Sequence, residues 1–214
     1  MNSNSIDIEK YIEAHSSPEL PILTKIYRET NLSQINPRMV SGHNQGLFLS
    51  FISKMIKPTT ILEIGTYTGY SAICLAQGLQ HGGVLNTIEV DDEVADLAGK
   101  YFAESGLTQS IHLHIENALQ LIPELNLMFD LIFIDGEKRE YPSYFHTCIP
   151  YLKKGGYLIA DNVLWEGKVI DNKYNNDEAT QAIKEFIMLI SSEKSLEHVL
   201  LPIRDGLMLA RKKD

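Results

Sequence analysis

A short apolar strand followed by a glycine turn and a helix constrains the fold of this chain more than any other feature. It occupies Ile61–Ser71, with the sequence ILEIGTYTGYS, and its apolar start is typical of a strand buried on both faces of a parallel sheet. Gly65 allows a sharp turn and a close approach of the backbone to a ligand. Because the apolar spacing from Tyr70 to Leu79 predicts a helix, the stretch forms the first βα unit of a nucleotide-type site.

The residues of this turn argue against a phosphate-bearing ligand. Gly65 and Gly69 are spaced G-x-x-x-G rather than G-x-G-x-x-G, so the dinucleotide fingerprint is absent, and no Lys-Ser/Thr pair completes a P-loop. Glu63, at the end of the strand, would repel phosphate and favour a cationic ligand. The alternative is an ordinary βα turn with glycines present by chance.

Helical and strand patterns alternate along the rest of the chain. Helices are predicted over Ile6–Ala14, Leu20–Thr30, Gln45–Ile56, Glu93–Ser105, Ala118–Leu125, Tyr141–Leu152 and Asp177–Ser192. Strands are predicted over Val84–Glu89, Ile111–Ile115, Asp130–Asp135, Tyr157–Asp161, Leu196–Ile203 and Leu207–Arg211. The joint Arg204-Asp205-Gly206 between the last two is short enough to require an antiparallel hairpin.

Five alternating βα units and a terminal hairpin predict an α/β sandwich with a mostly parallel, Rossmann-like sheet. The length of 214 residues suits a single domain, with N-terminal helices over 1–57 and the core over 58–214. Ligands of such sheets bind beyond the carboxyl ends of the strands.

Composition limits the kinds of binding partner and the cellular compartment that we expect. The net charge of −9 disfavours nonspecific binding to nucleic acid or anionic membrane. We expect neither a membrane span nor a signal peptide, because no apolar run is long enough to cross a membrane and the first residues, MNSNSIDIEK, are polar. Cys74 and Cys148 lie in apolar helical patterns and are predicted to be buried free thiols, which agrees with a cytoplasmic protein.

Acidic residues end four of the five predicted parallel strands. They are Glu63, Glu89, Asp135 and Asp161, the last followed by Asn162. Because one edge of the sheet would then carry self-repelling charge, a cation is expected there to offset it. Glu89 is spaced from the glycine turn about as a ribose-binding carboxylate would be. Its alternative role is that of a solvated acid at a helix N-terminus.

Asp135, Asp161 and Asn162 provide two carboxylates and an amide carbonyl. These are hard oxygen donors, and three of them completed by water or substrate oxygens suit Mg²⁺ better than zinc. The alternative for Asp161-Asn162 is a strand-end turn or a helix cap. Lys138 could form a salt bridge with Asp135, or act as a base if nearby positive charge lowers its pKa.

Four segments of the chain are similar to motifs of a known family. In sequence order they are ILEIGTYTGYS, TIEVDDE, FDLIFIDGEKREYPSYF and LIADNVLWEGKV. Together they resemble the cation-dependent O-methyltransferases, which include catechol and caffeoyl-CoA O-methyltransferases and many small bacterial members. The resemblance extends from about Met39 to the terminal RDGLMLARKK. It implies a seven-stranded class I methyltransferase sheet with S-adenosyl-L-methionine bound at the glycine turn.

The resemblance also assigns site residues. Those matched to the cofactor site are Met39, Ser41, Glu63, Gly65, Tyr67, Ser71, Glu89, Asn117, Ala118 and Asp135. Those matched to the metal are Asp135, Asp161 and Asn162, and the catalytic residues are Lys138, as the general base, and Asp135. Within the cofactor set, Glu89 would take the ribose, Asn117 and Ala118 would border the adenine, and Met39 and Ser41 would lie beneath the sulfonium.

The expected reaction is methyl transfer to one hydroxyl of a vicinal dihydroxy aromatic, such as a catechol or a caffeoyl ester. Both acceptor oxygens would coordinate Mg²⁺, which acidifies one hydroxyl and aligns it with the sulfonium methyl, while Lys138 takes the proton. One rival is a tRNA 5-hydroxyuridine methyltransferase, for which the available basic residues are Lys153, Lys154, Arg211, Lys212 and Lys213. Another rival is a catalytically silent S-adenosylmethionine-binding module, which the complete metal set and Lys138 disfavour.

Two further expectations concern assembly and the acceptor. The N-terminal helices are extra to the minimal sheet fold, and members of the family are commonly homodimers, so we expect a homodimer in which this segment partly screens the acceptor pocket. Trp165 either covers the acceptor as a lid or anchors the loop that carries it.

Overall fold

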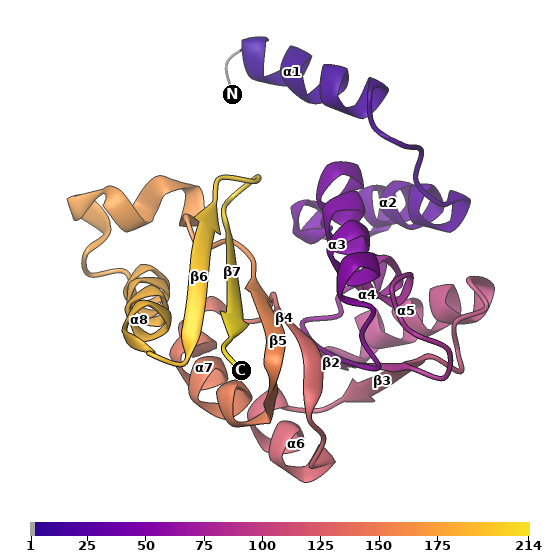
Figure 1. Cartoon of the computed structure of the whole chain (residues 1–214). Helices are drawn as coiled ribbons and strands as arrows, with labels where there is room; N and C mark the ends of the chain where they lie inside the picture. The colour runs from indigo at the N-terminus through magenta and orange to yellow at the C-terminus, as the bar shows by residue number, and fades with distance from the viewer. Residues whose placement is uncertain (1–2) are drawn as a thin grey trace.

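A seven-stranded sheet with the strand order β3-β2-β1-β4-β5-β7-β6 forms the centre of the chain (Figure 1). The computed structural model describes the backbone of residues 3–214, and the side chains of residue 8 and of residues 10–214. The strands are β1 (Thr60–Ile64), β2 (Val84–Glu89), β3 (Ile111–Ile115), β4 (Phe129–Ile134), β5 (Leu152–Ala160), β6 (Leu196–Leu201) and β7 (Leu207–Lys212). β1 to β5 pair in parallel and β7 pairs antiparallel with both β5 and β6, which confirms the predicted sheet and its terminal hairpin.

Helices cover both faces of the sheet. They are α1 (Ser3–Ala14), α2 (Pro21–Ser33), α3 (His43–Ile56), α4 (Tyr70–Ala76), α5 (Asp92–Glu104), α6 (Ala118–Leu125), α7 (Tyr141–Cys148) and α8 (Glu178–Ser192). Short 3₁₀ segments are η1 (Pro37–Met39), η2 (Lys138–Glu140), η3 (Ile149–Tyr151), η4 (Trp165–Ile170) and η5 (Asn172–Tyr174). Figure 1 shows α1 apart from the sheet, beyond α2 and α3.

The alternation of side chains along each strand divides the core into two clusters. Leu62 and Ile132 point to the face covered by α6, α7 and α8, whereas Ile61 and Leu131 point to the face covered by α2 to α5. All four side chains are fully buried. This burial on both faces explains why the parallel strands read as nearly continuous apolar runs in the sequence.

The predicted helix over Tyr141–Leu152 is wrong at its C-terminal end. α7 stops at Cys148, a 3₁₀ turn follows, and β5 already begins at Leu152 instead of Tyr157. Pro150 has no backbone N–H with which to continue the helical hydrogen bonds. The early part of β5 was missed because its glycines are not typical of a strand. In the structure the register with β4 shifts between the pairs Phe129–Leu152 and Leu131–Tyr157, and a bulge in β5 accommodates the extra residues.

The other predicted elements are present, with ends displaced by a few residues. No helix within the described part of the chain is long and apolar enough to cross a membrane.

Candidate active site

The site lies where the strand order reverses, between β1 and β4, as expected for open α/β sheets. Gly65 follows β1 with φ of 95°, and its N–H donates to the Ile88 carbonyl over 3.0 Å. A Cβ at this position would stand 2.3 Å from the Asp135 carbonyl oxygen. The sharp turn is confirmed, and the close approach that requires a glycine is made to the backbone of Asp135.

Glu63 is a buried carboxylate with unused hydrogen-bonding capacity. Its side chain lies at the end of β1 with the residue 0% exposed, and its Oε2 accepts from the Thr87 hydroxyl over 2.5 Å. Its Oε1 has no hydrogen-bond partner among the described residues. Burial is the main cause that raises the pKa of Glu63 to about 8; the negative charges of Asp135 and Glu89 add to this rise, and the hydrogen bond from Thr87 opposes it. A cationic ligand would satisfy both the free oxygen and the charge.

Glu89 closes the turn that follows β1. One of its oxygens accepts from the Tyr67 backbone N–H over 2.7 Å, and the other accepts from the N–H groups of Val90 (2.8 Å) and Asp91 (3.2 Å). Tyr67 itself has a positive φ of 47°. Glu89 is therefore an organised, partly buried acid at the end of β2, and its remaining lone pairs can accept hydroxyl donors.

The other residues matched to the cofactor differ in how far they are buried. Ser71 is buried in the first turn of α4, and Ser41 is buried just before α3. Asn117 follows β3 and caps α6 by accepting from the Leu119 N–H over 2.9 Å, so its side chain has a structural role, and Ala118 beside it is buried. Met39 is 56% exposed.

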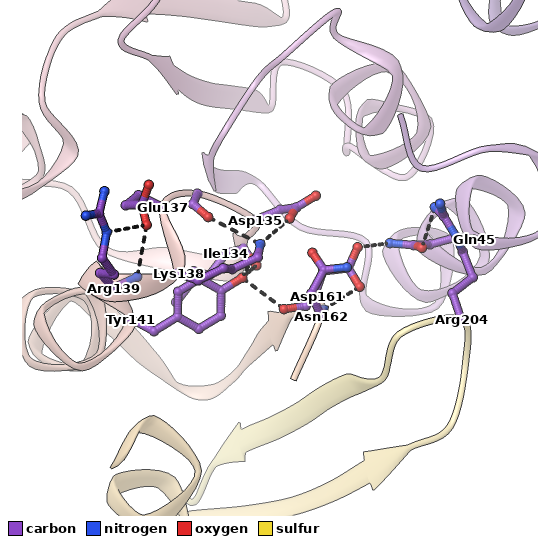
Figure 2. Close-up of polar contacts among 11 residues, drawn as sticks. Gln45, Ile134, Asp135, Glu137, Lys138, Arg139, Tyr141, Asp161, Asn162 and Arg204 are labelled. Carbon is purple, nitrogen blue, oxygen red and sulfur yellow. Dashed lines mark hydrogen bonds and ion pairs between the residues drawn. The ribbon is translucent and has the colours of Figure 1, made fainter. Parts of the chain in front are cut away.

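Asp135 and Asp161 follow the neighbouring strands β4 and β5, in which Ile134 is opposite Ala160 (Figure 2). Burial raises the pKa of Asp135 to about 6; the nearby charge of Asp161 adds to this rise, and the Lys138 ammonium opposes it. Asn162 has a positive φ of 57°, a conformation that asparagine tolerates.

Two carboxylates and one amide thus share one corner of the sheet, and a cation bound there would offset the repulsion between the two carboxylates. This oxygen set fits Mg²⁺. In the described part of the chain, no group of three or more His, Cys, Asp or Glu side chains is placed to hold a metal, so a site here depends on the Asn162 amide.

Lys138 lies between this acidic corner and Tyr141. Its ammonium donates to Asp135 Oδ1 (2.8 Å), to the Gly136 carbonyl (3.2 Å) and to the Tyr141 hydroxyl (2.9 Å) (Figure 2). Burial lowers its pKa, but the Asp135 carboxylate outweighs burial and leaves the pKa of Lys138 above its ordinary value. The salt bridge considered from the sequence is therefore present, and the role of Lys138 as a base stays a prediction.

Three residues of this cluster were missed by the sequence analysis: Gln45, Tyr141 and Arg204. The Tyr141 hydroxyl donates to the Asp161 carbonyl over 2.9 Å, and the Gln45 amide donates to Asp161 Oδ2 over 2.5 Å. One signal was available for Gln45: it lies one helical turn before Leu49 on the buried face of α3, where a polar residue is unusual.

Trp165 is partly buried and packs against the core cluster beneath α7 and α8. The Lys168 ammonium lies 4.9 Å from the centre of its indole ring, within cation–π distance. These contacts favour the role of loop anchor over that of lid.

A Rossmann-like sheet with a terminal antiparallel hairpin, a glycine turn after β1 and acids at the strand ends defines a class I methyltransferase. A family model described as O-methyltransferase matches residues 13–213, and the chain belongs to this family. It is 32% identical to a catechol O-methyltransferase of Niastella koreensis over 81% of this chain and 82% of that protein. It is 27% identical to caffeoyl-CoA O-methyltransferase 1 of Arabidopsis thaliana over 97% of this chain and 85% of the relative.

Solved structures agree with this assignment. An O-methyltransferase from Bacillus cereus, in complex with SAH, matches with a TM-score of 0.90 and 30% identity over 97% of each chain. TomG from Streptomyces achromogenes, in complex with SAM, matches with a TM-score of 0.91 and 26% identity over 100% of each chain. The protein is an S-adenosylmethionine-dependent O-methyltransferase.

Proposed function

We propose that the chain methylates one hydroxyl of a vicinal dihydroxy aromatic, of catechol or caffeoyl type, and that the reaction requires a divalent cation, which we expect to be Mg²⁺. The observation that carries this proposal is the pairing of Asp135 and Asp161 at adjacent strand ends with Asn162 beside them. The printed names of the relatives, catechol and caffeoyl-CoA O-methyltransferases, support the same acceptor class.

In this proposal each group of the site has a separate task. Glu63 pairs with the ammonium of S-adenosylmethionine through its free oxygen, and Glu89 accepts the ribose hydroxyls. Asp135, Asp161 and Asn162 hold the cation, which when bound would acidify the acceptor hydroxyl. Tyr141 keeps Lys138 in place, and Lys138 would take the hydroxyl proton at Nζ as a neutral amine, once the positive charges of the bound cation and of the sulfonium lower its pKa and release its present proton.

Chelation tests the metal dependence. EDTA should abolish methyl transfer to a catechol acceptor, and added Mg²⁺ or Mn²⁺ should restore it. Asp161→Ala should lose turnover and still bind S-adenosylhomocysteine in calorimetry, because the proposal places Asp161 on the acceptor side. Full turnover after exhaustive chelation would make the oxygen cluster structural. A panel of catechols, caffeoyl esters and bulk tRNA would then identify the acceptor class.

The tRNA alternative is less well supported by the placement of the basic residues. Lys153 and Lys154 lie at the start of β5, at the opposite end of the strand from Asp161. Several of these cations already have partners: Lys153 pairs with Asp130, and Arg211 pairs with Glu197. Turnover of any dihydroxy aromatic would exclude the silent binding module.

A homodimer in the cytoplasm completes the proposal. Large apolar side chains are exposed on the N-terminal helices, among them Tyr11 (64%), Phe51 (57%) and Met55 (75%), and a second copy would cover them. Cys74 and Cys148 are free and buried, which suits a reducing compartment.

A further inference from the structure

Gln45 is a buried amide that connects two charged groups of the site. It lies in the first turn of α3, and the residue is 0% exposed. Its Nε2 donates to Asp161 Oδ2 over 2.5 Å, and its Oε1 accepts from Arg204 Nη1 over 3.0 Å (Figure 2). A carboxylate on one side and a guanidinium on the other leave only one orientation of the amide that satisfies both.

Arg204 holds the other end of this connection. It belongs to the turn between β6 and β7 and has a positive φ of 50°. Its Nη1 also donates to the carbonyls of Val40 (3.3 Å) and Ser41, immediately before α3. The guanidinium thus joins the terminal hairpin to the segment that introduces α3, and Gln45 is held from both sides.

The same contacts leave Asp161 with little freedom. Its Oδ1 accepts from the Asn162 N–H over 2.7 Å, its Oδ2 accepts from Gln45, and its residue is 3% exposed. Each oxygen keeps further lone pairs for a ligand. Because the Gln45 amide is neutral, it orients the carboxylate without cancelling the negative charge that a cation would need. A lysine in its place would compete with the cation.

We infer that Gln45 and Arg204 are positioning residues that fix the Asp161 carboxylate for a divalent cation. Gln45 touches the metal ligand, and Arg204 acts through Gln45. The inference rests on the proposed function, since it assigns Asp161 to a cation. It means that the β6–β7 turn, remote in sequence from β4 and α3, helps to set the geometry of the acceptor side of the site.

Binding of Mn²⁺, measured by calorimetry on the S-adenosylhomocysteine complex without acceptor, tests the inference. Loss of a group that orients a metal ligand typically weakens metal affinity about 10–100-fold, and we expect this of Gln45→Leu and of Arg204→Met. The affinity for S-adenosylhomocysteine should stay unchanged in Gln45→Leu, whose lost contacts involve only Asp161 and Arg204. The double variant should bind Mn²⁺ no more weakly than Gln45→Leu alone, because both changes disrupt one connection.

Gln77→Leu is the matched control. Gln77 accepts from Ser50 and Lys54 at the end of α4, so the same change of side chain disturbs helix packing away from the acidic corner. Mn²⁺ affinity equal to that of the control in a folded Gln45→Leu protein would overturn the inference. Should Gln45→Leu fail to fold by circular dichroism, Arg204→Lys provides the same test, because one ammonium cannot reproduce the planar guanidinium contacts.

The wild-type protein separates this inference from the proposed function. If the wild type binds neither Mn²⁺ nor Mg²⁺, the metal-dependent function and the positioning role both fall. If the wild type binds the cation and Gln45→Leu binds it equally well, the metal-dependent function stands and only the positioning role is refuted.

Discussion

Replacement of Glu63 by glutamine should remove a pH-dependent loss of stability. The carboxyl has an ordinary pKa of 4.5 and a pKa of about 8 in the folded chain, because it is buried at the end of β1. Below pH 4.5 it is protonated whether the chain is folded or not. Between pH 4.5 and about 8 the unfolded chain has lost the proton and the folded chain keeps it, so the free energy of unfolding falls as pH rises.

The magnitude follows from the size of this shift. Each pH unit in the window costs about 1.4 kcal/mol, which amounts to about 3 kcal/mol between pH 4.5 and pH 7. Glutamine keeps an acceptor oxygen for the Thr87 hydroxyl and carries no titrating charge. The difference in unfolding free energy between Glu63→Gln and the wild type should therefore grow with pH in favour of the variant, up to about pH 8.

Urea unfolding of the ligand-free protein at pH 5, 6, 7 and 8 measures this difference directly. Asp130 and Asp177, whose pKa values are lowered from 3.8, are ionised in both the folded and the unfolded chain from pH 5 upward, so they add no slope in this range. Glu124→Gln, on the exposed surface of α6, is the matched control and should run parallel to the wild type. Parallel curves for Glu63→Gln as well would refute the reasoning.

The same residue links cofactor binding to protons. An ammonium placed beside the free oxygen of Glu63 would favour the ionised carboxylate, so at pH 7 binding of S-adenosylhomocysteine should release close to one proton. Calorimetry in buffers of different ionisation enthalpy gives the number of protons. Glu63→Gln should bind more weakly and lose this release.

Three further predictions concern other parts of the site and the assembly. Glu89→Ala should weaken S-adenosylhomocysteine binding by about 1–3 kcal/mol in calorimetry, because it leaves the ribose hydroxyls and the turn N–H groups unpaired, and unchanged affinity would remove Glu89 from the site. Lys138→Met should lower kcat about 10²–10⁴-fold with little change in cofactor affinity if Lys138 is the base, whereas near-normal kcat at saturating Mg²⁺ would leave it as the ion pair with Asp135. Light scattering at micromolar concentration should give the mass of a dimer, and a mass near 24.1 kDa would contradict that assembly.

The parts of the fold that could be predicted are those whose signal is local. A strand such as β4 is buried on both faces and therefore appears in the sequence as an apolar run. An amphipathic helix such as α8 is buried on one face, so its apolar residues recur with the helical period. The boundary between α7 and β5 was predicted wrongly because its signal is not local. Its position depends on pairing with β4 and on a bulge, which no short window of sequence contains.

The acids of the site were predictable because strand topology places them. Once β1, β2, β4 and β5 are parallel, the residues at or just beyond their carboxyl ends must meet at one edge. Glu63, Glu89, Asp135 and Asp161 could therefore be selected from the sequence. Their hydrogen-bond partners could not. Gln45 and Arg204 come from α3 and from the terminal hairpin, and only the packed tertiary structure brings them to Asp161.

The cofactor side and the acceptor side of the site are mechanically joined, and the joint is the glycine of the first turn. Gly65 packs its Cα against the Asp135 carbonyl with no room for a Cβ, and the Asp135 N–H donates back to the Ile64 carbonyl over 2.8 Å. The turn that should contact S-adenosylmethionine and the first acid of the metal set therefore share one stretch of backbone contact. Under the proposed function, a displacement of either would move the other, so these backbone contacts of the sheet would help to set the distance between methyl donor and acceptor.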